Sequence, residues 1–398
     1  MRPTTAPVLS AEEVQALRAR TDSALGLPGR AYFSSEFYAA ERRDLFAASW
    51  VGIGFASDVE NAGDIQPITI AGWELVLVRA HNSSLKCFYN VCRHRGMKII
   101  ASKCSANELR CPYHSWTYGL DGCLVETPAT AEIRGKAGFE VEKASLGLVP
   151  VRCEEWFGIV FVNIDGQALP LREHLNPTVS RVGRSFDLSE FRPARGGRSG
   201  KFDCAANWKV VLEGGVEDYH ALHRIARQRV DHSIEDGGFV YSGISSRSRI
   251  EGWRPSSGGE VGETQLPVSS WMKKWSIVET LLLMIYPNTL LICSPNWISI
   301  SLIIPMGPEN TVCIAKTYFA EGGHTEPYAA IREESGKYWK SIFDESGRIW
   351  AEIQALQRQR EELGLATRFS LYFERCLHLF QLYIAERLIA SDGVSGSA

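Results

Sequence analysis

The pattern of apolar and polar positions predicts helices at both ends of the chain and short strands between them. Apolar positions at helical spacing, Val14, Leu17 and Leu25, predict a helix over residues 10–25. Ser10, followed three residues later by Glu13, is a capping-box sequence that begins this helix. Residues 36–49 predict a second short helix. From Trp50 the pattern changes to short apolar runs separated by Gly and Asn.

These short runs indicate an all-β domain over roughly residues 46–165. The predicted strands are residues 51–55, 65–70, 74–79, 85–90 and 158–164. Two loops that carry cysteine and histidine interrupt the strands, and we expect them at one end of the domain.

Residues 166–398 combine strands with longer helices. Residues 181–200 are rich in Arg, Gly and Ser, which is typical of a linker or a surface excursion, and a helix opens at Asn207. A block of strands follows, and then two long helices. The predicted strands are residues 276–286, 289–293, 297–305 and 311–319, and the helices are residues 328–361 and 371–390. The chain is therefore expected to be α+β, with an antiparallel sheet wrapped by helices and residues 1–45 packed on this second domain.

Composition sets limits on function. The 398 residues are 45% hydrophobic and 22% charged with net charge −3, an ordinary globular balance without the basic stripe of a nucleic-acid-binding protein. The apolar stretch 281–305 is cut by two Pro-Asn pairs, which excludes it as a membrane span. The first residues show no apolar signal-peptide core, so we expect a cytoplasmic protein with reduced thiols.

Two couplets of cysteine and histidine indicate an iron–sulfur centre. Cys92-Arg-His94 and Cys111-Pro-Tyr-His114 offer two thiolates and two imidazoles. In a Rieske [2Fe–2S] cluster one iron takes two sulfurs and the other takes two ring nitrogens. Zinc also accepts this ligand set, but zinc sites usually group Cys with Cys and His with His, whereas each couplet here mixes the two. The spacing therefore favours a Rieske cluster over a zinc site.

The residues around the couplets refine this interpretation. Rieske centres of respiratory complexes carry one more cysteine in each loop, and Met97 and Tyr113 occupy those places here, so no disulfide joins the loops. This pattern resembles the lower-potential centres of ferredoxins and oxygenases. Cys104, between the couplets, is either a rival ligand or a small filler residue. Trp116 and Tyr118 are expected to pack against the cluster and exclude water.

A second candidate metal site follows Asn207-Trp208-Lys209. His220 and His223 are three residues apart, so on a helix they lie on one face, and Glu217 precedes them on the same face. Two histidines and one carboxylate form the facial triad that holds non-heme Fe(II) and leaves open positions for O₂.

Together these motifs resemble the α subunits of Rieske non-heme iron oxygenases, from about residue 30 to about residue 390. The resemblance implies a Rieske domain with a [2Fe–2S] cluster, followed by a helix-grip (START-like) catalytic domain with a mononuclear iron. It implies that Cys92, His94, Cys111 and His114 hold the cluster and that His220 and His223 bind iron. It also implies that Glu217 bridges a cluster histidine and an iron histidine of neighbouring subunits.

The chain departs from the family pattern in two places. The family usually has four residues between its iron-binding histidines, whereas two separate His220 from His223. The position of the carboxylate ligand falls on Ser346, so the ligand would be Asp344 or Glu345, and we favour Asp344. Asp344 is equally well explained as a helix N-cap.

The resemblance implies an enzyme that hydroxylates or demethylates a small organic substrate with O₂, as a monooxygenase or a dioxygenase. Aromatic acids and alkylamines are the substrate types expected. Because no Gly-x-Gly-x-x-Gly fingerprint follows a strand, electrons from NAD(P)H would come through a separate reductase or ferredoxin. The family forms homotrimers or α₃β₃ hexamers. The alternative is a non-catalytic electron-relay or structural subunit with a degraded iron site, and the sequence leaves the substrate open.

Overall fold

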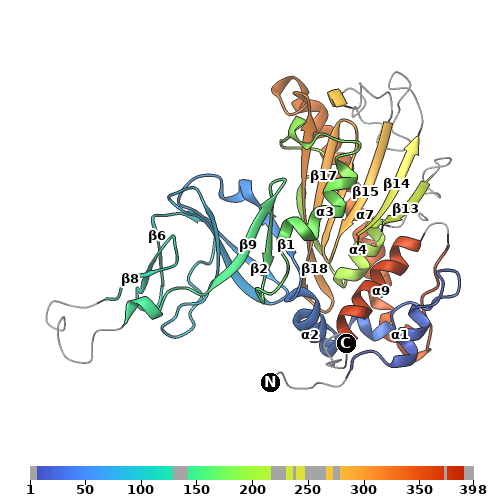
Figure 1. Cartoon of the computed structure of the whole chain (residues 1–398), viewed down its shortest axis with the longest axis horizontal. Coiled ribbons are helices and arrows are strands. Elements are labelled where there is room, and N and C mark those ends of the chain that lie inside the picture. The colour runs from blue at the N-terminus through green and yellow to red at the C-terminus, as the bar shows by residue number, and fades with distance from the viewer. Residues whose placement is uncertain are drawn as a thin grey trace. The chain divides into compact units, whose positions relative to one another are not determined.

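The structure is a computed structural model in which the chain divides into two compact units. It describes residues 7–128, 142–216, 230–235, 239–246, 266–271, 278–371 and 374–389, with the backbone alone for residues 230–235, 239–246 and 278–280. One unit is Trp50–Ala168, and the other joins Met1–Ser49 to Leu169–Ala398 (Figure 1).

The first unit is built from antiparallel strands, which confirms its predicted all-β character. Its larger sheet has the order β1-β10-β9-β4-β3-β2-β5, and a smaller sheet has the order β6-β7-β8. Strand β1 is fully buried and its bounds are those predicted from the sequence. The strands are β1 (Val51–Phe55), β2 (Asp64–Ile70), β3 (Trp73–Arg79), β4 (Leu85–Tyr89), β5 (Cys104–Ser105), β6 (Glu108–Arg110), β7 (Thr117–Gly119), β8 (Leu124–Glu126), β9 (Pro150–Trp156) and β10 (Ile159–Asn163).

The second unit contains a long antiparallel sheet with the order β11-β18-β17-β16-β15-β14-β13, and β12 also pairs with β18. The predicted strand block forms its centre, where nearly every residue of β17 is buried. The strands are β11 (Phe191–Pro193), β12 (Gly200–Cys204), β13 (Val230–Glu235), β14 (Phe239–Ser246), β15 (Val278–Ile285), β16 (Thr289–Cys293), β17 (Trp297–Gly307) and β18 (Asn310–Ala320).

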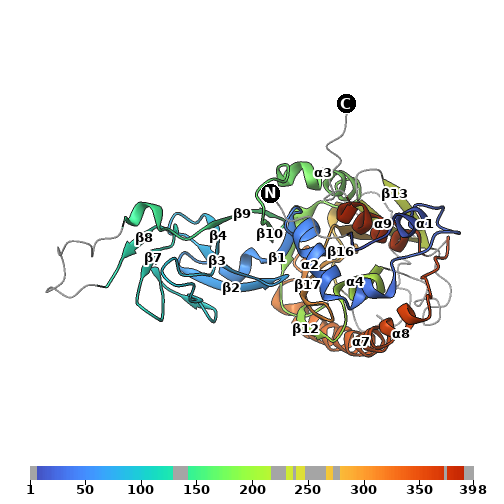
Figure 2. The ribbon, with the colours of Figure 1, turned by 90° about the horizontal axis from the view of Figure 1, so that it is seen from below.

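Helices of the N-terminal segment and of the second half of the chain accompany this sheet. Among them α4 lies between α7 and α9 and contacts both (Figure 2). The described helices of this unit are α1 (Ala11–Leu17), η1 (Gly29–Tyr32), α2 (Ser35–Ala40), η2 (Glu41–Phe46), α3 (Leu171–Val182), η5 (Leu188–Glu190), α4 (Trp208–Val216), η8 (Glu326–Tyr328), α7 (Ala329–Ala355), α8 (Gln357–Glu362) and α9 (Arg375–Ile389). None of the helices in the described residues is long and apolar enough to cross a membrane.

Several predicted boundaries were wrong. The capping box of Ser10 and Glu13 is present, but α1 ends at Leu17 rather than near residue 25. Residues 181–200 are not a simple linker, because η5 and β11 lie within this stretch and β12 begins at Gly200. Helix α3 was missed because Pro177 lies inside it and hides the helical pattern.

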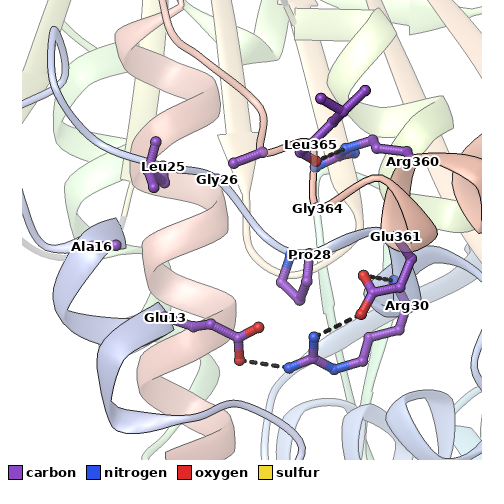
Figure 3. A pocket seen from close by; sticks show the side chains of 11 residues that line it. Glu13, Ala16, Leu25, Gly26, Pro28, Arg30, Arg360, Glu361, Gly364 and Leu365 are labelled. Carbon is purple, nitrogen blue, oxygen red and sulfur yellow. Dashed lines mark hydrogen bonds and ion pairs between the residues drawn. The ribbon is translucent and has the colours of Figure 1, made fainter.

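Ion pairs and hydrogen bonds of Arg30 and Arg360 join the N-terminal segment to α8 (Figure 3). The guanidinium group of Arg30 donates to Glu13, at 2.5 Å, and to Glu361, at 2.9 Å. Arg360 donates to the carbonyl oxygens of Leu27 and Leu365. Residues 13 and 361 are far apart in sequence, so these contacts hold the segment that leads to Tyr32 in place.

Candidate metal centres

The two couplet loops share one backbone arrangement. In the first loop the Cys92 amide donates to the carbonyl of Met97, and Gly96 donates back to the Cys92 carbonyl. The second loop repeats this pattern at Cys111, with the carbonyl of Trp116 as acceptor and Ser115 as donor. The returning residue is left-handed in both loops, with φ 77° at Gly96 and 55° at Ser115. Each loop therefore turns back on its cysteine and presents the couplet at its tip.

The four predicted ligands form a buried pair and an outer pair. The thiols of Cys92 and Cys111 are buried, whereas His94 is exposed and His114 is half-buried. The two imidazole rings lie edge to face with centroids 4.6 Å apart, and Trp116 stacks on His94 at 4.8 Å. Burial, followed by the charges of His94 and Arg95, lowers the pKa of His114 and so favours the neutral imidazole that binds metal.

Tyr118 of β7 contacts the thiol pair directly. Its hydroxyl oxygen accepts a hydrogen bond from the Arg93 amide at 3.0 Å and lies 3.2 Å from the sulfur of Cys92. Because the amide uses an oxygen lone pair, the hydroxyl proton is free to point at the sulfur. Burial and then the hydrogen bond with Cys92 raise the pKa of Tyr118, so it remains a donor. From the sequence we expected Tyr118 only to pack against the cluster, whereas the structure adds a hydrogen bond to a predicted cluster ligand.

These residues fit a [2Fe–2S] cluster. The thiols lie inside, next to a hydrogen-bond donor, and the imidazoles lie outside, as a cluster with one sulfur-bound and one nitrogen-bound iron requires. Cys104, the rival ligand, is exposed on β5, where its strand pairs with β2.

Replacing Tyr118 by phenylalanine is expected to lower the reduction potential of the cluster. Hydrogen bonds to cluster sulfurs stabilise the reduced, more negative state. A hydrogen bond stronger by about 1 kcal/mol in that state corresponds to roughly 40 mV for one electron. A redox titration followed by visible circular dichroism measures the shift. Tyr113→Phe is the control, because it keeps the ring that packs on His114 at 3.7 Å. An unchanged potential in Tyr118→Phe contradicts the assigned hydrogen bond.

The second predicted site follows the described part of α4 in the sequence. Glu217, His220 and His223 lie outside the described residues, so their roles remain predictions. Helix α4 is described as far as Val216, and Glu217 is the next residue in the sequence. The contacts of α4 therefore act immediately before the predicted iron-binding segment.

A fully buried ion pair anchors the first turn of α4. The ammonium of Lys209 donates to Glu41 of η2 at 2.6 Å, and the indole nitrogen of Trp208 donates to the same carboxylate at 3.0 Å. Both charged side chains have no accessible surface. Burial is the largest effect on both, so the pKa of Glu41 is raised and the pKa of Lys209 is lowered despite their attraction.

The next turn of α4 holds a second buried carboxyl group. The Oε1 atom of Glu213 accepts hydrogen bonds from the Tyr32 hydroxyl at 2.8 Å and from the Gln381 amide at 2.9 Å. Burial raises the pKa of Glu213 to about 7, against the lowering effects of Tyr32, Lys209, Gln381 and Arg360. Helix α4 is thus joined to η1 and α9 at a residue that lies four positions before Glu217 in the sequence.

Asp344, the predicted carboxylate ligand, lies in the interior of α7. Its side chain is 55% exposed and pairs with Lys340 at 2.7 Å. The N-cap of α7 is Tyr328, so the alternative interpretation of Asp344 as an N-cap was wrong. Its iron-binding role stays a prediction. Within the parts of the chain that the structure describes, no three His, Cys, Asp or Glu side chains gather around one point as ligands of a single ion.

One unit of the chain is all-β and carries two equivalent Cys/His loops, and the other contains a helix-covered antiparallel sheet. These features define an iron–sulfur redox protein with a second, larger domain. Comparison with known protein families agrees with this class of protein. Residues 49–142 match the Rieske [2Fe-2S] domain, and residues 191–390 match the catalytic domain of the ring-hydroxylating α subunit. The chain belongs to the Rieske-type ring-hydroxylating α-subunit family. This membership confirms the predicted fold class and the predicted cofactors, a [2Fe–2S] cluster and a mononuclear iron.

Known relatives include both monooxygenases and dioxygenases. The carnitine monooxygenase oxygenase subunit of Escherichia coli K12 is 33% identical over 203 residues, covering 51% of this chain and 52% of the relative. The biphenyl dioxygenase subunit alpha of Paraburkholderia xenovorans is 33% identical over 215 residues, covering 52% of this chain and 46% of the relative. The chain thus matches about half the length of these curated relatives.

Solved structures share the fold over nearly the whole chain. A quaternary ammonium Rieske monooxygenase superposes with a TM-score of 0.73 at 23% identity, covering 92% of this chain and 96% of the other. Naphthalene 1,2-dioxygenase from a Rhodococcus species superposes with a TM-score of 0.74 at 18% identity, covering 96% of this chain and 100% of the other.

Proposed function

We propose that the protein is the α subunit of an oxygenase that hydroxylates or demethylates a small organic substrate of the alkylamine or aromatic acid type. The observation that carries the proposal is the pair of equivalent loops with two buried thiols, two outer imidazoles and the Tyr118 hydroxyl at Cys92. Such a centre moves single electrons, and the family match adds a catalytic domain to receive them. The carnitine and biphenyl oxygenase relatives support the two substrate types.

In this proposal the cluster supplies single electrons and the mononuclear iron supplies the activation of O₂. Cys92, Cys111, His94 and His114 would hold the cluster. His94 is exposed and His114 is half-buried, so these two ligands would face the acceptor of the electron. Trp116 stacks on His94 and belongs to the same buried apolar cluster as Cys92 and Cys111, which would keep water from the thiol side.

The mononuclear iron would be held by His220 and His223, with Asp344 as the proposed carboxylate. Glu217 would join a cluster histidine to an iron histidine across a subunit boundary. The anchoring of α4 by Glu41, outside that segment, supports this role, because ligand geometry requires a fixed backbone.

Electrons from NAD(P)H would come from a separate reductase or ferredoxin, and the working assembly would be a homotrimer, with or without a β subunit. Residues 46–165 would form the Rieske domain and residues 166–398 the catalytic domain, on which residues 1–45 pack. Two contacts support that packing: the hydrogen bond between Thr21 and His378, and the ion pair between Arg30 and Glu361.

One observation favours the alternative of an electron-relay subunit without oxygenase activity. Asp344 is exposed and paired with Lys340, which is the setting of a surface ion pair and not of a ligand in an enclosed iron site. A Lys340→Met variant tests whether Asp344 is the iron ligand. If it is, its release from the ion pair should strengthen iron binding, and unchanged binding argues for another carboxylate.

The proposed function is tested with His220→Ala and chemically reduced protein, which removes the need for the reductase. The wild type should hold about three irons per chain and form product with O₂ in one turnover, whereas the variant should hold about two and form none. The Rieske absorption should persist in both. His81→Ala, at an exposed histidine, is the control. A wild type with two irons and no product from alkylamine or aromatic substrates would overturn the proposal.

A further inference from the structure

Glu213 is a buried carboxyl group that the proposed mechanism does not use. It lies on α4, four residues before Glu217, and its carboxyl group is enclosed by protein atoms although part of the residue remains accessible. The groups that face it come from four elements: Tyr32 of η1, Lys209 of α4, Arg360 of α8 and Gln381 of α9.

The hydrogen bonds around Glu213 have a fixed direction. The amide oxygen of Gln381 accepts from the Leu27 backbone at 2.7 Å, which leaves its NH₂ group facing Glu213 and the Tyr32 hydroxyl. Tyr32 accepts from Gln381 at 3.1 Å and donates to Glu213 at 2.8 Å. Both donors therefore converge on one oxygen of Glu213, and an amide oxygen at the same place would serve them equally well.

The charges nearby do not require Glu213 to be ionised. The closest ammonium on the same helix, Lys209, is already paired with Glu41 at 2.6 Å. In the described part of the chain no ion pair reaches Glu213, and Arg360 uses its guanidinium group for Leu27, Leu365 and Gln357. A carboxyl group held by two neutral donors and surrounded by protein is less costly as the neutral acid.

We propose that Glu213, as a neutral carboxylic acid, is the positioning residue that fixes α4 against η1 and α9, and that iron binding by the predicted ligands after α4 depends on this junction. This inference rests on the proposed function, because it takes residues 217–223 as iron-binding. Ionisation of Glu213 would place an unpaired negative charge among Tyr32, Gln381 and the neighbouring protein atoms. This charge would loosen the contact of α4 with η1 and α9.

The pH dependence follows from the raised pKa of Glu213, about 7 when folded against roughly 4.3 when unfolded. Because the folded pKa is the higher one, the contribution of Glu213 to the stability of the folded protein is fully present below the unfolded pKa. This contribution is lost as the pH rises through 7. If iron binds only the form with neutral Glu213, its affinity weakens by about tenfold at pH 8 relative to a chain that cannot ionise there.

The test compares Fe(II) dissociation constants of the wild type and Glu213→Gln at pH 6 and pH 8, by anaerobic competition with a chelator. Glutamine keeps the accepting oxygen and cannot ionise, and dividing the two constants cancels the protonation of the histidine ligands. The wild-type constant divided by the variant constant should rise about tenfold from pH 6 to pH 8. Glu361→Gln is the matched control: hydrogen bonds from Arg30 lower the pKa of Glu361 against the effect of burial, so its ratio should stay constant. Glu213→Leu should lose the mononuclear iron at both pH values and keep the Rieske absorption.

A ratio that does not change with pH overturns the inference, as does full iron binding by Glu213→Leu. If the wild type binds no third iron, the proposed function fails, and thermal unfolding then decides about Glu213. A melting temperature of Glu213→Gln that rises relative to the wild type between pH 6 and pH 8 supports the neutral acid, and a constant difference overturns it. This comparison also decides the matter if Glu213→Leu does not fold.

Discussion

Replacing Lys209 by methionine should lower the free energy of unfolding of the helix-and-sheet unit by about 3–5 kcal/mol. The ammonium and the Glu41 carboxylate are both inaccessible, and among the described residues the Trp208 indole is the one further donor to Glu41. Methionine fills similar space but leaves the carboxylate buried without a counter-charge. The aromatic rings of Tyr32, Phe37 and Trp208, 5.1 to 5.4 Å from the ammonium, also lose a cation–π partner.

A double-mutant cycle separates the pair from its surroundings. Glu41→Gln should cost a similar amount alone, and Lys209→Met combined with Glu41→Gln should recover much of the loss, because no buried charge remains. Denaturant unfolding measures the free energy of unfolding of each variant. The helix-and-sheet unit is followed by a signal other than the Rieske absorption, which reports on the other unit. Lys337→Met is the matched control: its ion pair with Glu333 is 3.0 Å long but mostly exposed, so the loss should stay below about 1 kcal/mol. Additive losses in the cycle would show that the two charges do not stabilise each other.

Local sequence signals predicted much of the fold. The capping box at Ser10, strand β1 and strand β16 depend on neighbouring residues, and their sequences indicated them correctly. Helix α3 was missed because a proline within the helix outweighs the spacing of its apolar residues. Spacing also sufficed for the couplets, because both ligands of each pair lie in one short loop.

The buried polar groups around α4 could not be predicted in the same way. Glu41 and Lys209 are separated by 168 positions, and Glu213 and Gln381 likewise by 168, so no local pattern connects them. A charged residue on an amphipathic helix normally indicates a solvated face. Only the packing of the N-terminal segment and α9 on α4 turns Lys209 and Glu213 inward, and this packing depends on contacts between distant segments.

Substituting alanine for Gly214 should displace α4 from α7 and weaken the binding of the mononuclear iron. A methyl group at this position would overlap the indole nitrogen of Trp350, a rigid and buried side chain. Alanine favours the helix by about 1 kcal/mol, but forcing extra volume into a packed contact costs roughly 1–3 kcal/mol. We therefore expect a net loss of stability and a larger loss of iron, because the predicted ligands follow the displaced helix.

The neighbouring glycine provides a matched control for this prediction. A methyl group on Gly215 would lie 3.3 Å from the end of the Leu290 side chain, which can adjust, so Gly215→Ala gains the same helix preference without the rigid contact. Gly215→Ala should be as stable as the wild type or more so and keep its iron, whereas Gly214→Ala should lose both. Thermal unfolding and the iron count per chain distinguish them. Equal behaviour of the two variants would mean that the contact between α4 and α7 does not position the iron-binding segment, and the anchoring would then rest on Glu41 and Glu213.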